Sequence, residues 1–119
     1  ARTNFEVLRK IADRETFDVS QADLALEEIA SLEEWMEYDS VNFQSDEHDV
    51  IVDALFGTGL TRPLEGVYAE AAAFIHACGA EPDGPLVVAL DMPSGLCADH
   101  ATINGVVPCA DVTVTFTAP

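Results

Sequence analysis

The sequence predicts an α/β fold with a parallel, doubly wound sheet. Three apolar runs of strand length, at residues 49–56, 86–91 and 111–116, are the first observation behind this prediction. The second is the helical spacing of apolar residues between the first two runs. Strands that alternate with helices indicate right-handed βαβ crossovers, which make neighbouring strands parallel and place helices on both faces of the sheet.

Two further helical stretches are predicted in the first half of the chain. The first covers residues 3–13. The second has two candidate N-terminal caps, Ser20 with Asp23 and Ser31 with Glu34, so this stretch is either one helix or two. Its apolar face consists of Leu26, Ile29, Leu32 and Met36.

A strand, a loop and a helix follow. Residues 49–56 (DVIVDALF) form an almost continuous apolar run, which is typical of a strand covered on both faces. The loop at 57–66 is rich in glycine and proline, and the helix after it is expected to end at Gly79. The buried stripe predicted for that helix consists of Tyr68, Ala71, Ala72, Ile75 and Cys78.

The strand pattern also predicts the domain organisation. A doubly wound domain normally has about five or more strands, whereas three clear runs are visible here. The chain begins with a helical pattern that no strand run precedes, and the third run lies close to its last residue. Residues 1–119 are therefore expected to be one partial domain, the second half of a larger unit.

The charge of the chain argues against two classes of partner. The chain has 22 Asp and Glu residues against 5 Lys and Arg, which gives a net charge of −17. Phosphate backbones and anionic lipids need a basic surface, so neither nucleic-acid binding nor membrane binding is expected. No apolar run approaches the roughly 20 residues of a membrane-spanning helix. Because 14 of the acidic residues lie within residues 1–50, the bias indicates either a solvated helix face or adaptation to high salt.

Cysteine and histidine usage shows no metal or disulfide pattern. The cysteines are an odd set without a C-x-x-C pair, and the histidines are scattered at spacings unlike those of metal ligands. These residues are Cys78, Cys97, Cys109, His48, His76 and His100. Reduced thiols in a cytoplasmic protein are therefore expected.

Two acidic residues lie where an open α/β sheet binds its ligands, outside the carboxyl ends of the strands. Asp53 lies near the end of the first apolar run, and Asp91 is the last residue of the second. A carboxylate in apolar sequence is costly unless it meets a cation, hydrogen-bond donors or a proton-transfer task. The two residues are therefore a candidate functional pair. The alternative is that each carboxylate accepts hydrogen bonds from nearby loop amides.

The loop directly after the first run is a candidate binding loop, because its glycines allow positive φ and its amides can line a phosphate or a ribose. Its residues are Gly57, Thr58, Gly59, Leu60, Thr61, Arg62 and Pro63. It is not the dinucleotide fingerprint, since Arg62 replaces the third glycine of G-x-G-x-x-G, and it lacks the Lys-Ser/Thr of a P-loop. A plain tight turn is the alternative, and Arg62 is either a phosphate partner or a surface charge.

The turn at residues 91–95, after the second run, brings a hydroxyl group to the same edge. Pro93 fixes φ and Gly95 permits a left-handed conformation, which holds Ser94 near the end of the strand. A serine hydrolase is not supported, because Ser94 lacks the G-x-S-x-G elbow and no histidine is placed as its base. Carboxylate, hydroxyl and carbonyl oxygens instead favour a hard cation.

Three segments together resemble the NAD(P)H-hydrate epimerases, also called the YjeF N-terminal domain: DVIVDALFGTGLTRPLEG at 49–66, LVVALDMPSGL at 86–96 and ADVTVTFTAP at 110–119. The resemblance of residues 1–48 is loose. The resemblance implies a Rossmann-like three-layer αβα sandwich with a mostly parallel sheet. It also implies an isomerase that interconverts the R and S forms of hydrated NADH and NADPH, a repair reaction for these cofactors.

The site residues implied by the resemblance agree with the candidates above. A potassium ion is expected at Asp53 and Ser94, and the substrate is expected at the loop from Gly57 to Pro63 and at Asp91. Asp91 is also the candidate for the catalytic acid and base. The glycine- and asparagine-rich loop of the family (G-x-x-N-N-G-G-D-G) is absent from these 119 residues, so the chain is expected to be a fragment that is inactive alone.

Two other functions remain open at this point. The main alternative is a non-catalytic dimerisation or scaffold module of the same fold, although such a module need not keep both carboxylates and the glycine loop. Another nucleotide-binding α/β enzyme is the second alternative. Besides the small-molecule substrate, the partners implied by the resemblance are a second copy in a homodimer and a C-terminal dehydratase domain that acts on the S form.

Overall fold

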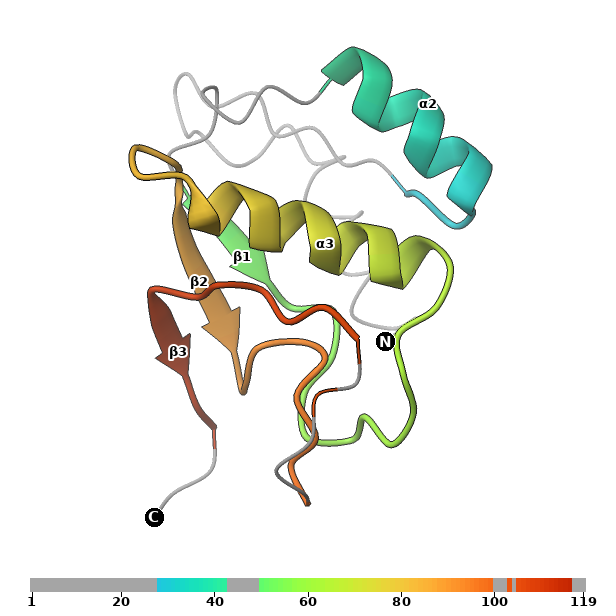
Figure 1. Cartoon of the computed structure of the whole chain (residues 1–119). Coiled ribbons are helices and arrows are strands. Elements are labelled where there is room, and N and C mark those ends of the chain that lie inside the picture. Colours follow the sequence, from blue (N-terminus) through green and yellow to red (C-terminus); the bar gives the residue numbers. More distant parts are fainter. Residues whose placement is uncertain (1–27, 43–49, 100–102, 104, 117–119) are drawn as a thin grey trace, which may run out of the picture.

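The computed structural model describes residues 28–42, 50–99, 103 and 105–116, which form two helices and three strands. Figure 1 shows α3 lying across the sheet, with α2 beside α3. The helix predicted at 3–13 and the cap formed by Ser20 with Asp23 lie outside the described residues. In chain order the elements are α2 (Leu32–Asn42), β1 (Val50–Asp53), α3 (Val67–Ala80), β2 (Leu86–Leu90) and β3 (Val112–Val114).

The three strands form one parallel sheet in the order β1-β2-β3. In this register Val50 lies opposite Leu86, and Val88 lies opposite Val112. The arrangement confirms the predicted α/β class, and each of the three apolar runs contains a strand. Because all three strands point the same way, their carboxyl ends meet at one edge of the sheet (Figure 1).

The core lies between α3 and one face of the sheet. Val87 and Ala89 of β2 are completely buried on this face. The buried residues of α3 are Ala71, Ala72, Ile75 and Cys78, as predicted. Tyr68 was wrongly included in that stripe, because its side chain at the start of α3 is 51% exposed.

The helix α3 continues past the residue that was expected to end it. Gly79 lies inside the helix, and the cap is Glu81, whose backbone N–H donates to the carbonyl of Cys78 (3.3 Å). A Cβ at Gly79 would collide with the carbonyl oxygen of Cys109. Glycine is therefore required here because the segment before β3 packs directly against the helix.

The second face of the sheet differs from the prediction. Its apolar side chains are 43–53% exposed: Val50, Val52, Leu86, Val112 and Val114. In the described part of the chain α3 packs on the sheet and α2 packs on α3, where the rings of Trp35 and Phe74 meet edge to face at 6.0 Å. The described residues thus supply two of the three predicted layers.

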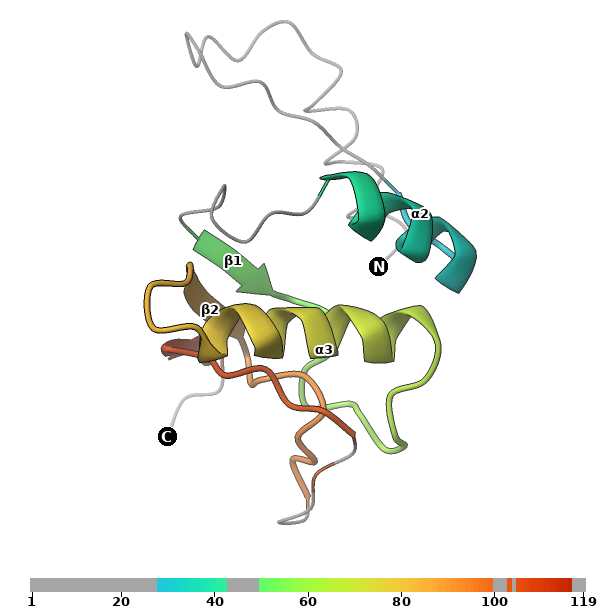
Figure 2. The ribbon, with the colours of Figure 1, turned by 45° about the horizontal axis from the view of Figure 1, so that its top comes forward.

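The connection from β2 to β3 contains a non-helical segment that packs near the core. Residues 105–111 are not helical and run beside α3 (Figure 2). There the carbonyl oxygen of Val107 lies 2.7 Å from His76 Nδ1. Gly105 and Pro108 explain the absence of a helix in this segment, because both residues strongly disfavour helix formation.

Of the two candidate caps, Ser31 with Glu34 begins α2. The backbone N–H of Glu34 donates to Ser31 Oγ (3.1 Å), and the backbone N–H of Ser31 donates to Glu34 Oε2 (3.2 Å). The N–H of Ala30 donates to the same carboxylate oxygen (2.8 Å). This reciprocal pair is a capping box, and residues 28–30 before it are not helical.

Replacing Ser31 by alanine is expected to lower the local stability of α2 by about 1 kcal/mol, because a terminal N–H loses its acceptor. Hydrogen exchange of the α2 backbone amides measures this loss. The variant Ser31→Asp keeps an acceptor at the cap and should retain the original protection. Unchanged protection in Ser31→Ala would contradict the capping role.

Candidate functional site

The carboxyl ends of β1 and β2 bring Asp53 and Ser94 into contact, although the two residues are 41 positions apart. Asp53 is 0% exposed and Ser94 is 1% exposed. Asp53 Oδ1 accepts a hydrogen bond from Ser94 Oγ (2.6 Å), and Asp53 Oδ2 accepts one from the Ser94 backbone N–H (2.8 Å). The N–H of Leu55 also donates to Oδ1 (3.4 Å). Loop donors therefore satisfy this buried carboxylate, as the alternative interpretation of the sequence proposed.

Ser94 also fixes the start of the glycine-containing loop. The backbone N–H of Phe56 donates to Ser94 Oγ (3.0 Å), and the same hydroxyl lies 3.2 Å from the Phe56 carbonyl oxygen. Gly95 has the left-handed φ of 89° that the turn pattern predicted. Through these contacts the loop after β1 is tied to the turn after β2.

Asp91 has a different environment from Asp53. Its backbone is left-handed, with a φ of 72°, which is uncommon for a residue other than glycine. The N–H of Asp91 donates to the carbonyl of Val114 (2.7 Å), and its Oδ2 accepts from the backbone N–H of Thr58 (3.0 Å). Its Oδ1 has no hydrogen bond to any described residue, and the side chain is half-buried. Such strained backbone is typical of functional sites.

Gly57 allows the loop to approach Asp91 closely. A Cβ at Gly57 would collide with Asp91 Oδ2 and would lie 3.3 Å from the Cβ and Cγ of the same residue. Gly59 faces open space, with nothing within 4 Å of its Cβ position. Neither glycine has the positive φ that the sequence suggested, so close packing is the reason for glycine at position 57.

The loop uses only some of its amides internally. The N–H groups that donate to protein acceptors are those of Phe56, Thr58 and Leu60. The N–H groups without a hydrogen bond to any described residue are those of Gly57, Gly59, Thr61 and Arg62. The Leu60 side chain packs in a buried cluster with Leu64 and Ala72.

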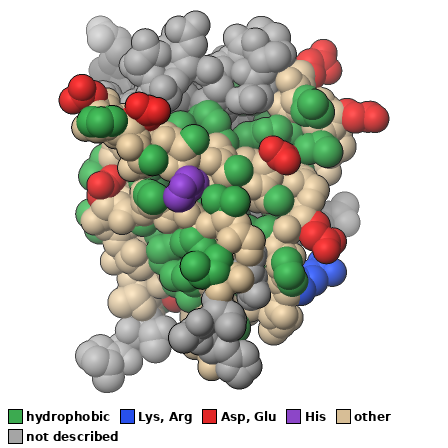
Figure 3. Space-filling view, viewed as in Figure 1, with side chains coloured by type: hydrophobic (Ala, Val, Ile, Leu, Met, Phe, Trp, Pro, Cys, Tyr) green, Lys and Arg blue, Asp and Glu red, His purple; other side chains and the backbone are tan. Residues whose placement is uncertain are grey.

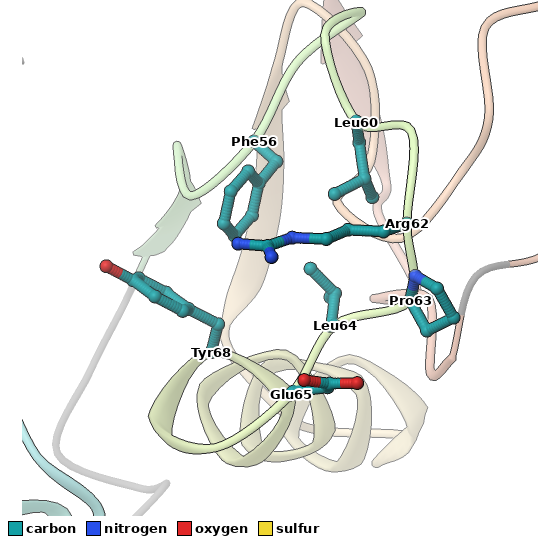
Figure 4. A pocket seen from close by; sticks show the side chains of 7 residues that line it. All are labelled: Phe56, Leu60, Arg62, Pro63, Leu64, Glu65 and Tyr68. Carbon is teal, nitrogen blue, oxygen red and sulfur yellow. The ribbon is translucent and has the colours of Figure 1, made fainter.

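A pocket of about 220 Å³ lies between this loop and the start of α3 (Figure 4). Its lining residues are Phe56, Leu60, Arg62, Pro63, Leu64, Glu65 and Tyr68. The rings of Phe56 and Tyr68 meet edge to face, with centroids 5.1 Å apart and an interplanar angle of 76°. Neither aromatic residue was predicted as a site residue, because both lie in apolar patterns typical of a core.

A comparison with protein families identifies the chain. The profile described as "YjeF-related protein N-terminus" matches residues 2–119. The chain belongs to this family. The match confirms the resemblance derived from the three motif segments, and it extends over the acidic first part of the chain, where the resemblance was loose.

Curated relatives of this YjeF-related domain have names from cofactor repair. The "Bifunctional NAD(P)H-hydrate repair enzyme Nnr" of Thermofilum pendens is 51% identical over 71 residues, which are 60% of this chain and 13% of the relative. The "NAD(P)H-hydrate epimerase" of Limosilactobacillus fermentum is 46% identical over 68 residues, 57% of this chain and 30% of the relative. The "NAD(P)H-hydrate epimerase" of Roseobacter litoralis is 46% identical over 80 residues, which are 65% of this chain and 33% of the relative. The match therefore spans a third or less of each relative, and no solved structure gives a significant match.

The oxygens at the sheet edge of this YjeF-related domain fit a hard cation. The described partners of the buried Asp53 carboxylate are neutral donors. Arg62 is the only Lys or Arg among the described residues, and it makes no ion pair with any of them. The Asp53 carboxylate, the Ser94 hydroxyl and the Phe56 carbonyl are the ligand types that hard cations prefer.

Outside the sheet edge, a cysteine and a histidine that are 33 residues apart in the sequence lie close together. Cys109 Sγ lies 3.4 Å from His76 Nδ1. Among the described residues, no three His, Cys, Asp or Glu side chains are grouped to hold a metal, and no helix is long and apolar enough to cross a membrane. Figure 3 shows apolar side chains at the centre of the face seen in Figure 1, with acidic side chains along its rim.

Proposed function

We propose that this domain interconverts the R and S forms of hydrated NADH and NADPH, as an NAD(P)H-hydrate epimerase. The names of its curated relatives support this reaction class. The observation that carries the proposal is the contrast between two neighbouring carboxylates. Asp53 is buried and both of its oxygens accept hydrogen bonds, whereas Asp91 is half-buried with one oxygen free of described partners. Carboxylates in such different environments perform different tasks.

Asp91 is the proposed acid and base. Inverting the hydroxylated ring carbon requires either ring opening or loss of water. In ring opening, Oδ1 of Asp91 accepts the hydroxyl proton while the electrons of the carbon–nitrogen bond move to nitrogen, and it returns the proton when the ring closes on the other face. In the loss of water, it donates a proton to the leaving hydroxyl and accepts one from the water that adds back. The hydrogen bond from Thr58 to Oδ2 holds the carboxylate in place.

Asp53 and Ser94 are the proposed ligands of a potassium ion, together with the Phe56 carbonyl. A bound potassium ion supplies a positive charge that offsets the Asp53 carboxylate and orients an anionic substrate. The protein groups have a second role, because Asp53 accepts the hydrogen bond from the Ser94 hydroxyl and that hydroxyl accepts one from the Phe56 backbone N–H. This chain of contacts positions the loop beside Asp91.

The loop at 57–63 is proposed to bind the substrate. Its side chains at Thr58, Thr61, Arg62 and Pro63 are exposed. Its amides without described partners can donate to phosphate oxygens, and Arg62 supplies the only positive side chain nearby in the described part of the chain. This arrangement suits a pyrophosphate-containing substrate in an acidic protein.

The close approach of Gly57 to Asp91 leads to a matched pair of variants. Gly57→Ala is expected to lower kcat/KM for epimerisation about a hundredfold, because the new Cβ displaces the Asp91 carboxylate by about 1 Å. Gly59→Ala is the comparison, because its Cβ meets no protein atom and leaves the Asp91 carboxylate in place. Its kcat should therefore be retained, and any loss should appear in KM. Chiral chromatography of the R and S forms gives both rates. Equal rates for the two variants would contradict the proposed close approach.

The proposed function is tested by supplying the full-length protein with R-hydrated NADH. We expect R-to-S conversion to exceed the spontaneous rate, and to be faster with potassium than without it. Conversion at the spontaneous rate under both conditions would overturn the proposal. That result would favour the non-catalytic dimerisation or scaffold module.

A dehydratase that consumes the S form is the proposed partner activity. The word "bifunctional" in the names of the relatives from Thermofilum pendens and Coxiella burnetii supports this pairing. An epimerase that supplies the S form allows the dehydratase to repair both forms of the damaged cofactor.

A further inference from the structure

We propose that the pocket between Phe56, Arg62 and Tyr68 binds the adenosine half of the hydrated dinucleotide, with the adenine on the aromatic wall and a phosphate at Arg62. This inference rests on the proposed function, because it assigns the part of the substrate that does not react. It adds Phe56 and Tyr68, which lie outside the predicted binding loop.

The aromatic wall of the pocket is suited to a flat ring. Tyr68 lies at the exposed start of α3, and its ring meets that of Phe56 at 76°. In an edge-to-face pair, the ring that presents its edge has neither of its faces covered by the other ring. Stacking on such rings binds any base, because every base has a π face. Leu60 and Leu64 line the same pocket with apolar side chains.

The charge at the pocket is suited to a phosphate. Arg62 is the only cation among the described residues, in a chain with a net charge of −17. Figure 4 shows its side chain extending across the pocket toward Phe56. A guanidinium group binds phosphate oxygens in a bidentate manner. Glu65 also lines the pocket, so one positive charge meets one negative charge there, whereas the rest of the chain is strongly acidic. Arg62 is therefore the position in the described part of the chain where a phosphate meets a cation.

The position of the pocket relative to Asp91 favours the adenosine half of the substrate as its ligand, rather than the half that reacts. Asp91 contacts the loop at Gly57 and Thr58, whereas the pocket is formed by Phe56 and by the loop from Leu60 onward. A dinucleotide with its reacting ring at Asp91 can place its pyrophosphate along the loop and its second ring in the pocket. Hydration makes the nicotinamide ring non-planar, whereas adenine stays flat and matches an aromatic wall.

Binding of substrate fragments to the full-length protein tests this assignment without any turnover. The probes are AMP, adenosine and nicotinamide mononucleotide, titrated by NMR. Tyr68→Ala should weaken AMP and adenosine about tenfold and leave nicotinamide mononucleotide unchanged. Tyr68→Phe is the control that keeps the ring, so it should bind AMP normally. Arg62→Gln should weaken AMP about tenfold but leave adenosine unchanged.

Three results would overturn the inference: no binding of AMP to the unaltered protein, equal AMP binding by Tyr68→Ala and Tyr68→Phe, or a loss confined to nicotinamide mononucleotide. These results differ from a failure of the proposed function. If the protein binds AMP through Tyr68 but does not convert R-hydrated NADH, the result supports the adenosine pocket and contradicts the epimerase function.

Discussion

Replacing Asp91 by asparagine is expected to lower kcat for R-to-S conversion by roughly 10²- to 10⁴-fold, with little change in KM. Asparagine has nearly the same shape and tolerates the left-handed backbone found at this position. Its side-chain oxygen can still accept the hydrogen bond from Thr58. The substitution therefore removes the group that exchanges a proton with the substrate and retains the geometry of the loop.

A matched control for this variant is Asp83→Asn, which makes the same chemical change on an exposed turn. It should leave kcat unaltered, because Asp83 lies in the turn between α3 and β2, at the opposite end of β2 from Asp91. Steady-state rates with R-hydrated NADH measure both effects. A kcat for Asp91→Asn close to that of Asp83→Asn would remove Asp91 from the chemistry.

Asp53→Asn is expected to have a different effect, on the stability of the fold and on the response to potassium. The carboxylate accepts hydrogen bonds from the hydroxyl and amide of Ser94 and from the amide of Leu55. Asparagine has a single acceptor oxygen, so at least one buried donor is left unpaired and the free energy of unfolding should fall by about 1–3 kcal/mol. The variant should also lose the response of the epimerisation rate to potassium.

Denaturant unfolding measures the first effect of Asp53→Asn, and rates at increasing potassium concentration measure the second. Asp111→Asn is the control, because Asp111 is exposed and asparagine can still accept its hydrogen bond from Val87 N–H (2.8 Å). We expect the stability of this control to change by less than about 0.5 kcal/mol. An Asp53→Asn variant with unaltered stability and an unaltered potassium response would contradict both roles.

The sheet edge could be predicted because it follows from the direction of the strands. Continuous apolar runs predict parallel strands, and the carboxyl ends of parallel strands share one edge. Asp53 and Ser94 could therefore be expected to lie close together. The capping box at Ser31 could also be predicted from the sequence, since it depends on a local spacing of three residues.

The remaining features depend on contacts between distant segments, which a local pattern does not contain. Gly57 and Gly79 resemble turn and cap glycines, but each is required because Asp91 or Cys109 occupies the space of a side chain. Tyr68 has the spacing of a core residue, yet it lies at the open end of α3 beside the pocket. The left-handed backbone of Asp91 likewise has no signature in sequence.

The division of work between the two carboxylates is tested most directly by one measurement, the potassium dependence of the R-to-S rate. It is made on three full-length proteins side by side: the unaltered protein, Asp53→Asn and Asp91→Asn. We expect the rate of the unaltered protein to rise with potassium concentration to a plateau. The rate of Asp91→Asn should follow the same potassium dependence but reach a plateau at least about a hundredfold lower. The rate of Asp53→Asn should not depend on potassium. A full plateau for Asp91→Asn, or an unaltered protein no faster than the spontaneous reaction, would contradict the proposed mechanism.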